Sequence, residues 1–112
     1  MSKIDIKVTL LENQITQEDI NTKAILIDNK IKYKEKDTIN ILDINKLEIK
    51  RNAKDYQLEL YFKQKKALYK YNGYELSLKL KTIETKINEQ EIYIKYEIIG
   101  TQNIYEYKIK WR

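Results

Sequence analysis

Two charged side chains stand where the sequence pattern otherwise directs apolar residues toward an interior. Apolar residues recur at every second position, and continuing this alternation places Glu35 after Tyr33 and Arg51 after Ile49 on the apolar face. A buried charge without a partner is strongly unfavourable, so each side chain needs one. Either the two residues pair with each other or reach solvent at a rim, or Arg51 binds a carboxylate or phosphate group inside the protein.

Six tyrosines occupy inward positions of the same alternation, and they form the second group of candidate residues. Their hydroxyl groups need hydrogen bonds when buried. They either fill the interior or line a pocket with a few polar tips. These tyrosines are Tyr33, Tyr69, Tyr71, Tyr96, Tyr105 and Tyr107.

Most catalytic chemistry is excluded by the residues that are absent. The chain has no Cys and no His, so thiolate chemistry, disulfides and the commonest general base and metal ligand are missing. Ser2 and Ser77 are the only serines, there is no glycine-rich phosphate loop, and most carboxylates alternate outward. We therefore expect no enzymatic activity, no metal site and no cofactor.

The charge balance is basic, with 22 Lys plus Arg against 17 Asp plus Glu and a net charge of +5. Twenty of these cations are lysines that alternate with acidic residues, a usage typical of coding bias in an AT-rich genome. The alternative is a nucleic-acid surface, on which the outward Tyr61 and Tyr93 would stack against bases.

The strongest local signal is the dipeptide Asn72-Gly73, which favours a two-residue hairpin turn because both positions tolerate positive φ. This hairpin organises the segment 66–82. Pairing outward from the turn sets four residue pairs opposite each other: Tyr71 with Tyr74, Lys70 with Glu75, Tyr69 with Leu76, and Ala67 with Leu78.

Period-two alternation extends along nearly the whole chain and predicts about nine or ten short strands joined by tight turns. We expect a polar loop at 11–18, a strand from 47 to 51, and a last hairpin made of 92–98 and 105–111. Closing a meander of this size removes its edges, so we predict a single all-β domain over residues 1–112. Its architecture is an up-and-down antiparallel barrel of about eight to ten strands.

The N-terminal segment MSKIDIKVTL alternates charges and lacks the apolar stretch of a secretory signal. The uninterrupted apolar runs are far shorter than a membrane span. We therefore expect a soluble cytoplasmic protein.

With the strands placed, the sequence resembles a family of small bacterial proteins of unknown function, the YwiB-like calycin-type barrels. The resemblance implies a closed barrel related in shape to lipocalins and fatty-acid-binding proteins, and it brings no established activity. The chain lacks a proline expected before Gly73 and a glycine expected after Arg51. The residues that carry the resemblance are Tyr33-x-Glu35, Thr38, Leu47-x-Ile49-x-Arg51, Phe62, Tyr69, Gly73, Thr82 and Ile92-x-Ile94-x-Tyr96-x-Ile98.

Two classes of function stay open. The first is a non-catalytic barrel that binds a small anionic or amphiphilic ligand through a mouth near Glu35, Arg51 and the Tyr71/Tyr74 hairpin. The second is a nucleic-acid-associated or protein-interaction barrel that uses its basic outer face. For the first class the candidate ligand-binding residues are Glu35, Arg51, Tyr33, Tyr69, Tyr71, Thr82 and Tyr96.

Overall fold

The computed structural model, which covers residues 1–112, is a closed barrel of ten antiparallel strands in up-and-down order. This confirms the predicted fold class. No helix is present that could cross a membrane. The strands are β1 (Ser2–Glu12), β2 (Ile15–Ile27), β3 (Lys30–Glu35), β4 (Thr38–Asp43), β5 (Glu48–Asn52), β6 (Tyr56–Tyr61), β7 (Lys66–Tyr71), β8 (Tyr74–Asn88), β9 (Glu91–Ile98) and β10 (Asn103–Trp111).

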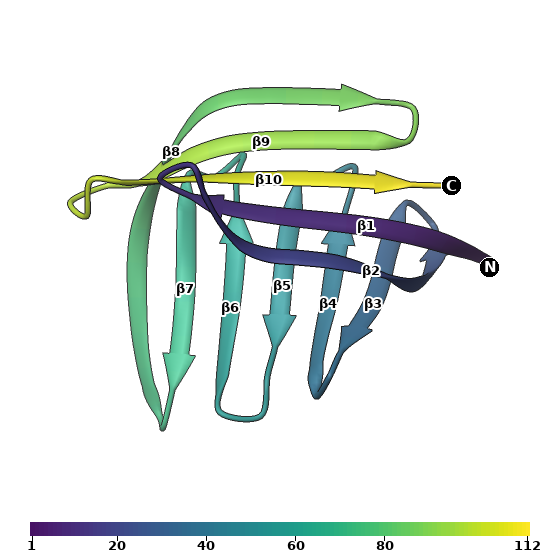
Figure 1. Ribbon diagram of the computed structural model, residues 1–112. Coiled ribbons are helices and arrows are strands. Elements are labelled where there is room, and N and C mark those ends of the chain that lie inside the picture. The colour runs from purple at the N-terminus through teal and green to yellow at the C-terminus, as the bar shows by residue number, and fades with distance from the viewer.

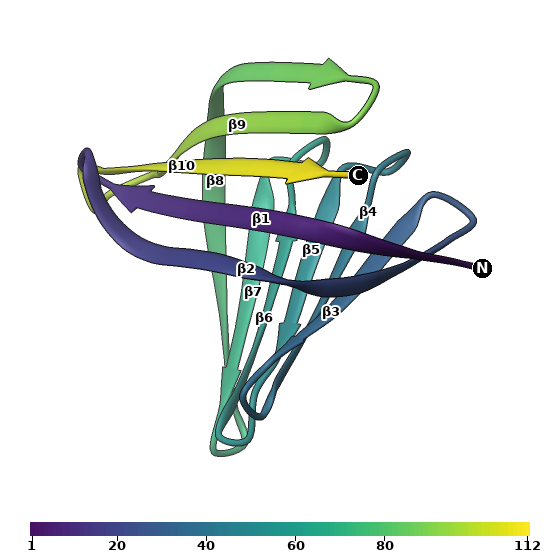
Figure 2. The same ribbon diagram turned by 45° about the vertical axis from the view of Figure 1, so that its right-hand side comes forward.

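The barrel is flattened into two layers whose strands cross (Figures 1 and 2). Strands β3 to β7 form one layer, and β1, β9 and β10 form the other. The long strands β2 and β8 belong to both. β2 pairs with β3 only over Ala24–Ile27, and β8 pairs with β7 only over Tyr74–Lys79, while each continues beside its other neighbour. β2 and β8 therefore each have a segment that is paired on one side only.

The core lies between the layers and consists of the apolar residues that alternate inward along each strand. Ile6 and Val8 on β1 and Ile92 and Ile94 on β9 are almost fully buried, while the residues between them point outward. Nineteen buried residues form one apolar cluster. Because strand side chains alternate between faces, period-two patterning is sufficient to build this core.

The predicted central hairpin is confirmed together with its register. Asn72 and Gly73 both have positive φ, 48° and 79°, as the turn requires. All four predicted pairs, from Tyr71 with Tyr74 to Ala67 with Leu78, lie opposite each other.

Two local predictions are wrong. The expected loop at 11–18 is a hairpin, because Asn13 and Gln14 both adopt positive φ, 49° and 69°, and so form a two-residue turn. β5 begins at Glu48 instead of Leu47, whose φ of 55° places it in the preceding turn although its side chain is buried.

Candidate functional site

The inner face of the β3–β7 layer becomes more polar from one end of the barrel to the other. Cross-strand pairing arranges its side chains in three successive rows. The first row is apolar: Ile31, Leu42, Ile49, Leu60 and Ala67. The second mixes polar and apolar residues: Tyr33, Asn40, Arg51, Leu58 and Tyr69. The third, at the mouth formed by the β5–β6 and β7–β8 turns, contains Glu35, Thr38, Tyr56, Tyr71 and Tyr74.

Arg51 forms an ion pair across the barrel with Glu18 of β2. Its Nη1 donates a hydrogen bond of 2.8 Å to Glu18 Oε1, and the two side chains are 12% and 22% exposed. The expected pairing of Arg51 with Glu35 is therefore wrong. The physical reason is the β1–β2 hairpin, which starts β2 at Ile15 and turns Glu18, opposite Leu10, toward the interior.

Several tyrosines surround this ion pair. Burial by itself lowers the pKa of the Arg51 guanidinium, but Tyr107 and the hydrogen-bonded Glu18 raise it, and the net shift is upward. Burial raises the pKa of Tyr107 to about 12 and also raises the pKa values of Tyr33 and Tyr96, while the positive charge of Arg51 opposes all three shifts. At neutral pH the site thus contains a charged guanidinium among neutral phenols.

Four buried polar atoms near this cluster have no hydrogen-bond partner within the protein. They are Glu35 Oε2, Asn40 Nδ2, Arg51 Nε and Thr82 Oγ1. Asn40 lies directly opposite Arg51, and Thr82 lies opposite Tyr96. Buried polar groups in native proteins are nearly always satisfied, so these four atoms need partners from outside the chain, either ordered water or a bound molecule.

The inward tyrosines divide into two groups. Tyr96 is packed in the interior, edge-on to Phe62 at 5.1 Å between centroids and stacked on Tyr105 at 5.3 Å. Tyr33 and Tyr107 are buried as well. Tyr69 instead stacks between Tyr56 and Tyr71, at 5.7 and 6.5 Å, in a series that extends toward the mouth.

The mouth itself exposes an aromatic surface. Tyr71 and Tyr74 are 47% and 79% exposed. They line a hollow of about 340 Å³ together with Tyr56 and the two turns beside it. The sequence predicted a mouth near this hairpin, but Glu35 and Arg51, which were expected beside it, do not line this hollow.

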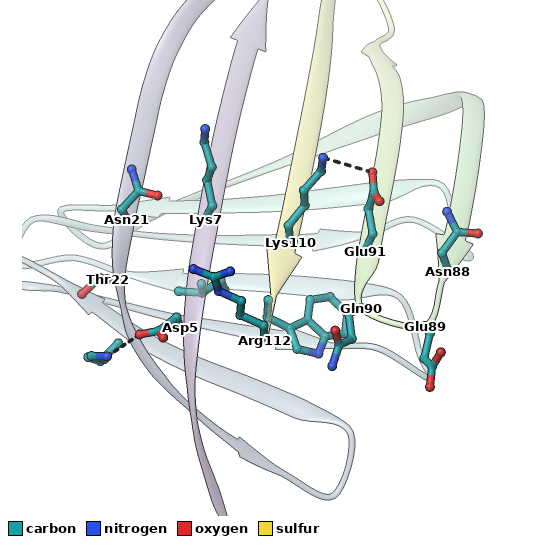
Figure 3. A pocket seen from close by; sticks show the side chains of 13 residues that line it. Asp5, Lys7, Asn21, Thr22, Asn88, Glu89, Gln90, Glu91, Lys110 and Arg112 are labelled. Carbon is teal, nitrogen blue, oxygen red and sulfur yellow. Dashed lines mark hydrogen bonds and ion pairs between the residues drawn. The ribbon is translucent and has the colours of Figure 1, made fainter.

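A second surface hollow, of about 970 Å³, lies elsewhere on the barrel (Figure 3). It is lined mainly by charged and amide side chains, among them Asp5, Glu91 and Arg112. Trp111 is one of its two apolar lining residues. A third hollow of about 580 Å³ lies beside β2 and β3. Arg51 and Asn40 line none of these three hollows.

The outward tyrosines already have partners. The Tyr61 hydroxyl donates to Glu59 at 3.0 Å, and Lys50 and Lys66 lie within 5.7 Å of its ring. Tyr93 donates to Glu106, and Lys86 lies over its ring at 6.0 Å. Each ring is therefore held among charged side chains of the outer face.

The structure brings most of the predicted site residues into one region. Tyr33, Glu35, Arg51, Thr82 and Tyr96 belong to the polar cluster or border it, while Tyr69 and Tyr71 form the path to the mouth. Sequence reasoning missed Glu18 and Asn40. Alternation from Ile20 back to Glu18, and from Leu42 back to Asn40, was the signal that could have found both.

Comparisons with known proteins give a fold and no activity. No protein-family model matches the chain, and a search of the curated proteins finds no match. The structure is similar to the crystal structure of the YwiB protein from Bacillus subtilis, with a TM-score of 0.55 over 98% of this chain and 89% of that chain. The sequence identity is 18%, so this similarity shows the fold alone.

Proposed function

We propose that the barrel binds a small amphiphile, with its polar head at Arg51 and Asn40 and its apolar part along the tyrosines that lead to the mouth. The observation that carries this proposal is the set of four buried polar atoms without partners, contributed by four different strands. The family that the sequence resembles consists of calycin-type barrels from bacteria, and we propose that the ligand is bound in the cytoplasm.

The donors and acceptors at the cluster suggest the chemistry of the head. Arg51 Nε and Asn40 Nδ2 can donate only, Glu35 Oε2 accepts when ionised, and Thr82 Oγ1 can do both. Glu18 already neutralises the charge of Arg51. A neutral head that has both a carbonyl oxygen and an N–H or O–H group, such as an amide, therefore fits better than a second carboxylate.

The tyrosines suggest the rest of the ligand. The stacked Tyr56, Tyr69 and Tyr71 run from beside Arg51 to the exposed rings at the mouth. Aromatic faces provide large contact areas at a small cost in side-chain entropy, and an exposed apolar surface rimmed by polar residues is typical of a binding site. Asn40 is 2% exposed and the Arg51 side chain is 12% exposed, so the proposed ligand is short.

Matched pairs of small probes test this proposal: octanamide against octanoate, and phenylacetamide against phenylacetate. Thermal unfolding is measured with each probe in excess, because a ligand at 100 times its dissociation constant adds about 2.7 kcal/mol to the free energy of unfolding. We expect the amides to raise the melting temperature more than the acids.

The variant Asn40→Leu separates binding from stability. Leucine has a similar shape and removes a buried donor that lacks a partner, so we expect the free energy of unfolding to rise by about 1 kcal/mol while the amide-induced shift disappears. Asn21→Leu, on the exposed outer face of β2, is the control and should keep the shift. The proposal is wrong if no probe shifts the wild-type protein, or if Asn40→Leu responds as the wild type does.

A second candidate function, binding of a polyanion such as nucleic acid, rests on the hollow beside β2 and β3. Its lining includes Lys3, Lys23, Lys32 and Lys34 and no carboxylate. Affinity for RNA that falls steeply with salt, and that is lost when Lys32 and Lys34 are both changed to Glu, would favour it.

A further inference from the structure

The far half of β8 leaves one edge of a sheet open. From Leu80 onward β8 pairs with β9, and no strand lies on its other side. Figures 1 and 2 show this green segment at the outer border of the β1–β9–β10 layer. Every second N–H and C=O group of such an edge points away from the sheet and can pair with another strand.

The side chains of this segment are exposed as well. Residues 83–88 are all exposed on both faces of the sheet, and they include the apolar Ile83 and Ile87, 44% and 51% exposed. The segment IETKIN also carries one acidic and one basic residue, Glu84 and Lys86. Charges on an edge strand discourage pairing with unrelated strands, but they permit a partner with the complementary order.

That complementary order is found in the segment itself. A two-fold axis normal to the sheet pairs residues of equal parity, because both copies must present the same face. With the axis at Thr85, Glu84 of each copy lies opposite Lys86 of the other. Ile87 then faces Ile83, the extra residue of a β-bulge in the pairing of β8 with β9. Opposite charges directly across a strand pair stabilise it.

The neighbouring registers lack this match. Moving the axis to Glu84 places two carboxylates opposite each other, and moving it to Lys86 places two ammonium groups opposite each other, which destabilises the pair. Within one chain Glu84 Oε1 and Lys86 Nζ are 3.5 Å apart. Two copies in the Thr85 register would therefore form a compact, alternating cluster of four charges.

We propose that the segment 83–87 of β8 pairs antiparallel with the same segment of a second copy, in the register centred on Thr85. The pairing joins the β1–β9–β10 layers of two barrels into one continuous sheet. It leaves the mouth near Tyr71 and Tyr74 open, because the β7–β8 turn lies at the other end of β8 (Figure 1).

Sedimentation velocity and light scattering over a wide range of protein concentration measure this association. We expect the mass to rise with concentration from 13.6 kDa toward twice that value. Glu84→Lys and Lys86→Glu each place two like-charge pairs in the dimer, so each should raise the dissociation constant about tenfold or more. Lys7→Glu, on the outer face of β1, is the control and should dimerise normally.

A mixture of the two variants provides the decisive measurement. In a mixed dimer the lysine that replaces Glu84 in one chain faces the glutamate that replaces Lys86 in the other. The native Lys86 of the first chain faces the native Glu84 of the second, so both opposite-charge pairs return. We expect the mixture to dimerise although neither variant does so alone, which also shows that both variants are folded. A wild-type protein that stays monomeric, charge variants that dimerise normally, or a mixture that stays monomeric would overturn the proposal.

Discussion

At the scale of the residue, Arg51 determines the character of the barrel interior. It is one of two arginines in a chain with twenty lysines, and it spans from β5 to Glu18 on β2 in the other layer. One ion pair thereby links both layers across the barrel. Its Nε remains without a partner, so the same guanidinium belongs to the core and to the candidate site.

Removing Arg51 should lower the free energy of unfolding, because its partner Glu18 is left without an opposite charge. Arg51→Met leaves the Glu18 carboxylate unpaired, and we expect a loss of about 2–3 kcal/mol in the free energy of unfolding, somewhat below the value for a fully buried pair because Glu18 is 22% exposed. The double variant Glu18→Leu/Arg51→Met should be more stable than Arg51→Met. Urea unfolding measures both.

The control for this cycle is Lys110→Met, which breaks an exposed ion pair with Glu91 and should change stability by no more than about 0.5 kcal/mol. If the double variant is as unstable as Arg51→Met, the unpaired Glu18 is not the cause of the loss.

Tyr107 should make the barrel sensitive to alkali. Burial raises its pKa from 10.0 to about 12, so the folded state favours the neutral phenol. The resulting stabilisation is complete below pH 10 and is lost as the pH rises through 12, about 2–3 kcal/mol in all. Tyr107→Phe should therefore lose less stability than the wild type between pH 9 and 11 in urea unfolding.

The control for alkaline unfolding is Tyr74→Phe, because that phenol is exposed at the mouth. It should show the same pH dependence as the wild type. Equal pH dependence in Tyr107→Phe and the wild type would contradict the role assigned to the buried phenol.

At the scale of the element, the sequence specified strands more reliably than it specified the links between them. Alternation around Tyr71 and Tyr74 and the Asn72-Gly73 turn were enough to predict a complete hairpin register. The turn at Asn13 and Gln14 has no glycine, so the sequence did not indicate its positive φ values. The end of β1 and the start of β2 were therefore predicted as a loop.

The same missed turn explains most of what was missed in the candidate site. Because residues 11–18 were expected to be a loop, Glu18 was not assigned to either face of a strand, although β2 in fact starts at Ile15. Glu35 was then the acidic residue that alternation placed on an inward position. The partner of Arg51 depends on which side chains meet across the two layers, and alternation within single strands does not contain that information. The tyrosine path to the mouth, in contrast, followed directly from strand parity.

At the scale of the whole molecule, the barrel is closed by the pairing of β1 with β10, which lie at opposite ends of the chain. The closing contacts are specific: the Asp5 and Arg112 backbones exchange two hydrogen bonds, of 2.8 and 3.0 Å. Every other neighbouring pair of strands is consecutive in the sequence. If the two ends of the chain are joined and new termini are made in another turn, no strand has to cross another to reach its place in the barrel.

This topology predicts that a circularly permuted chain folds to the same barrel. We join Arg112 to Met1 with a linker of about six residues, which spans roughly 20 Å when extended. The linker is therefore longer than the segment that precedes Asp5, whose backbone pairs with Arg112. New termini are placed between Lys63 and Gln64, both exposed in the β6–β7 turn. All ten strand pairings remain available, so we expect a cooperative unfolding transition and the wild-type circular dichroism spectrum.

Opening the chain inside a strand should have the opposite result. A permutant cut between Ile94 and Lys95 interrupts β9, where Ile94 is fully buried and the flanking backbone pairs with both β8 and β10. It should not unfold cooperatively, because the cut removes ladder hydrogen bonds on both sides at once. If the Lys63/Gln64 permutant also fails to fold while the wild type unfolds cooperatively, the barrel depends on the order in which its strands are joined and not on the closing β1–β10 pair alone.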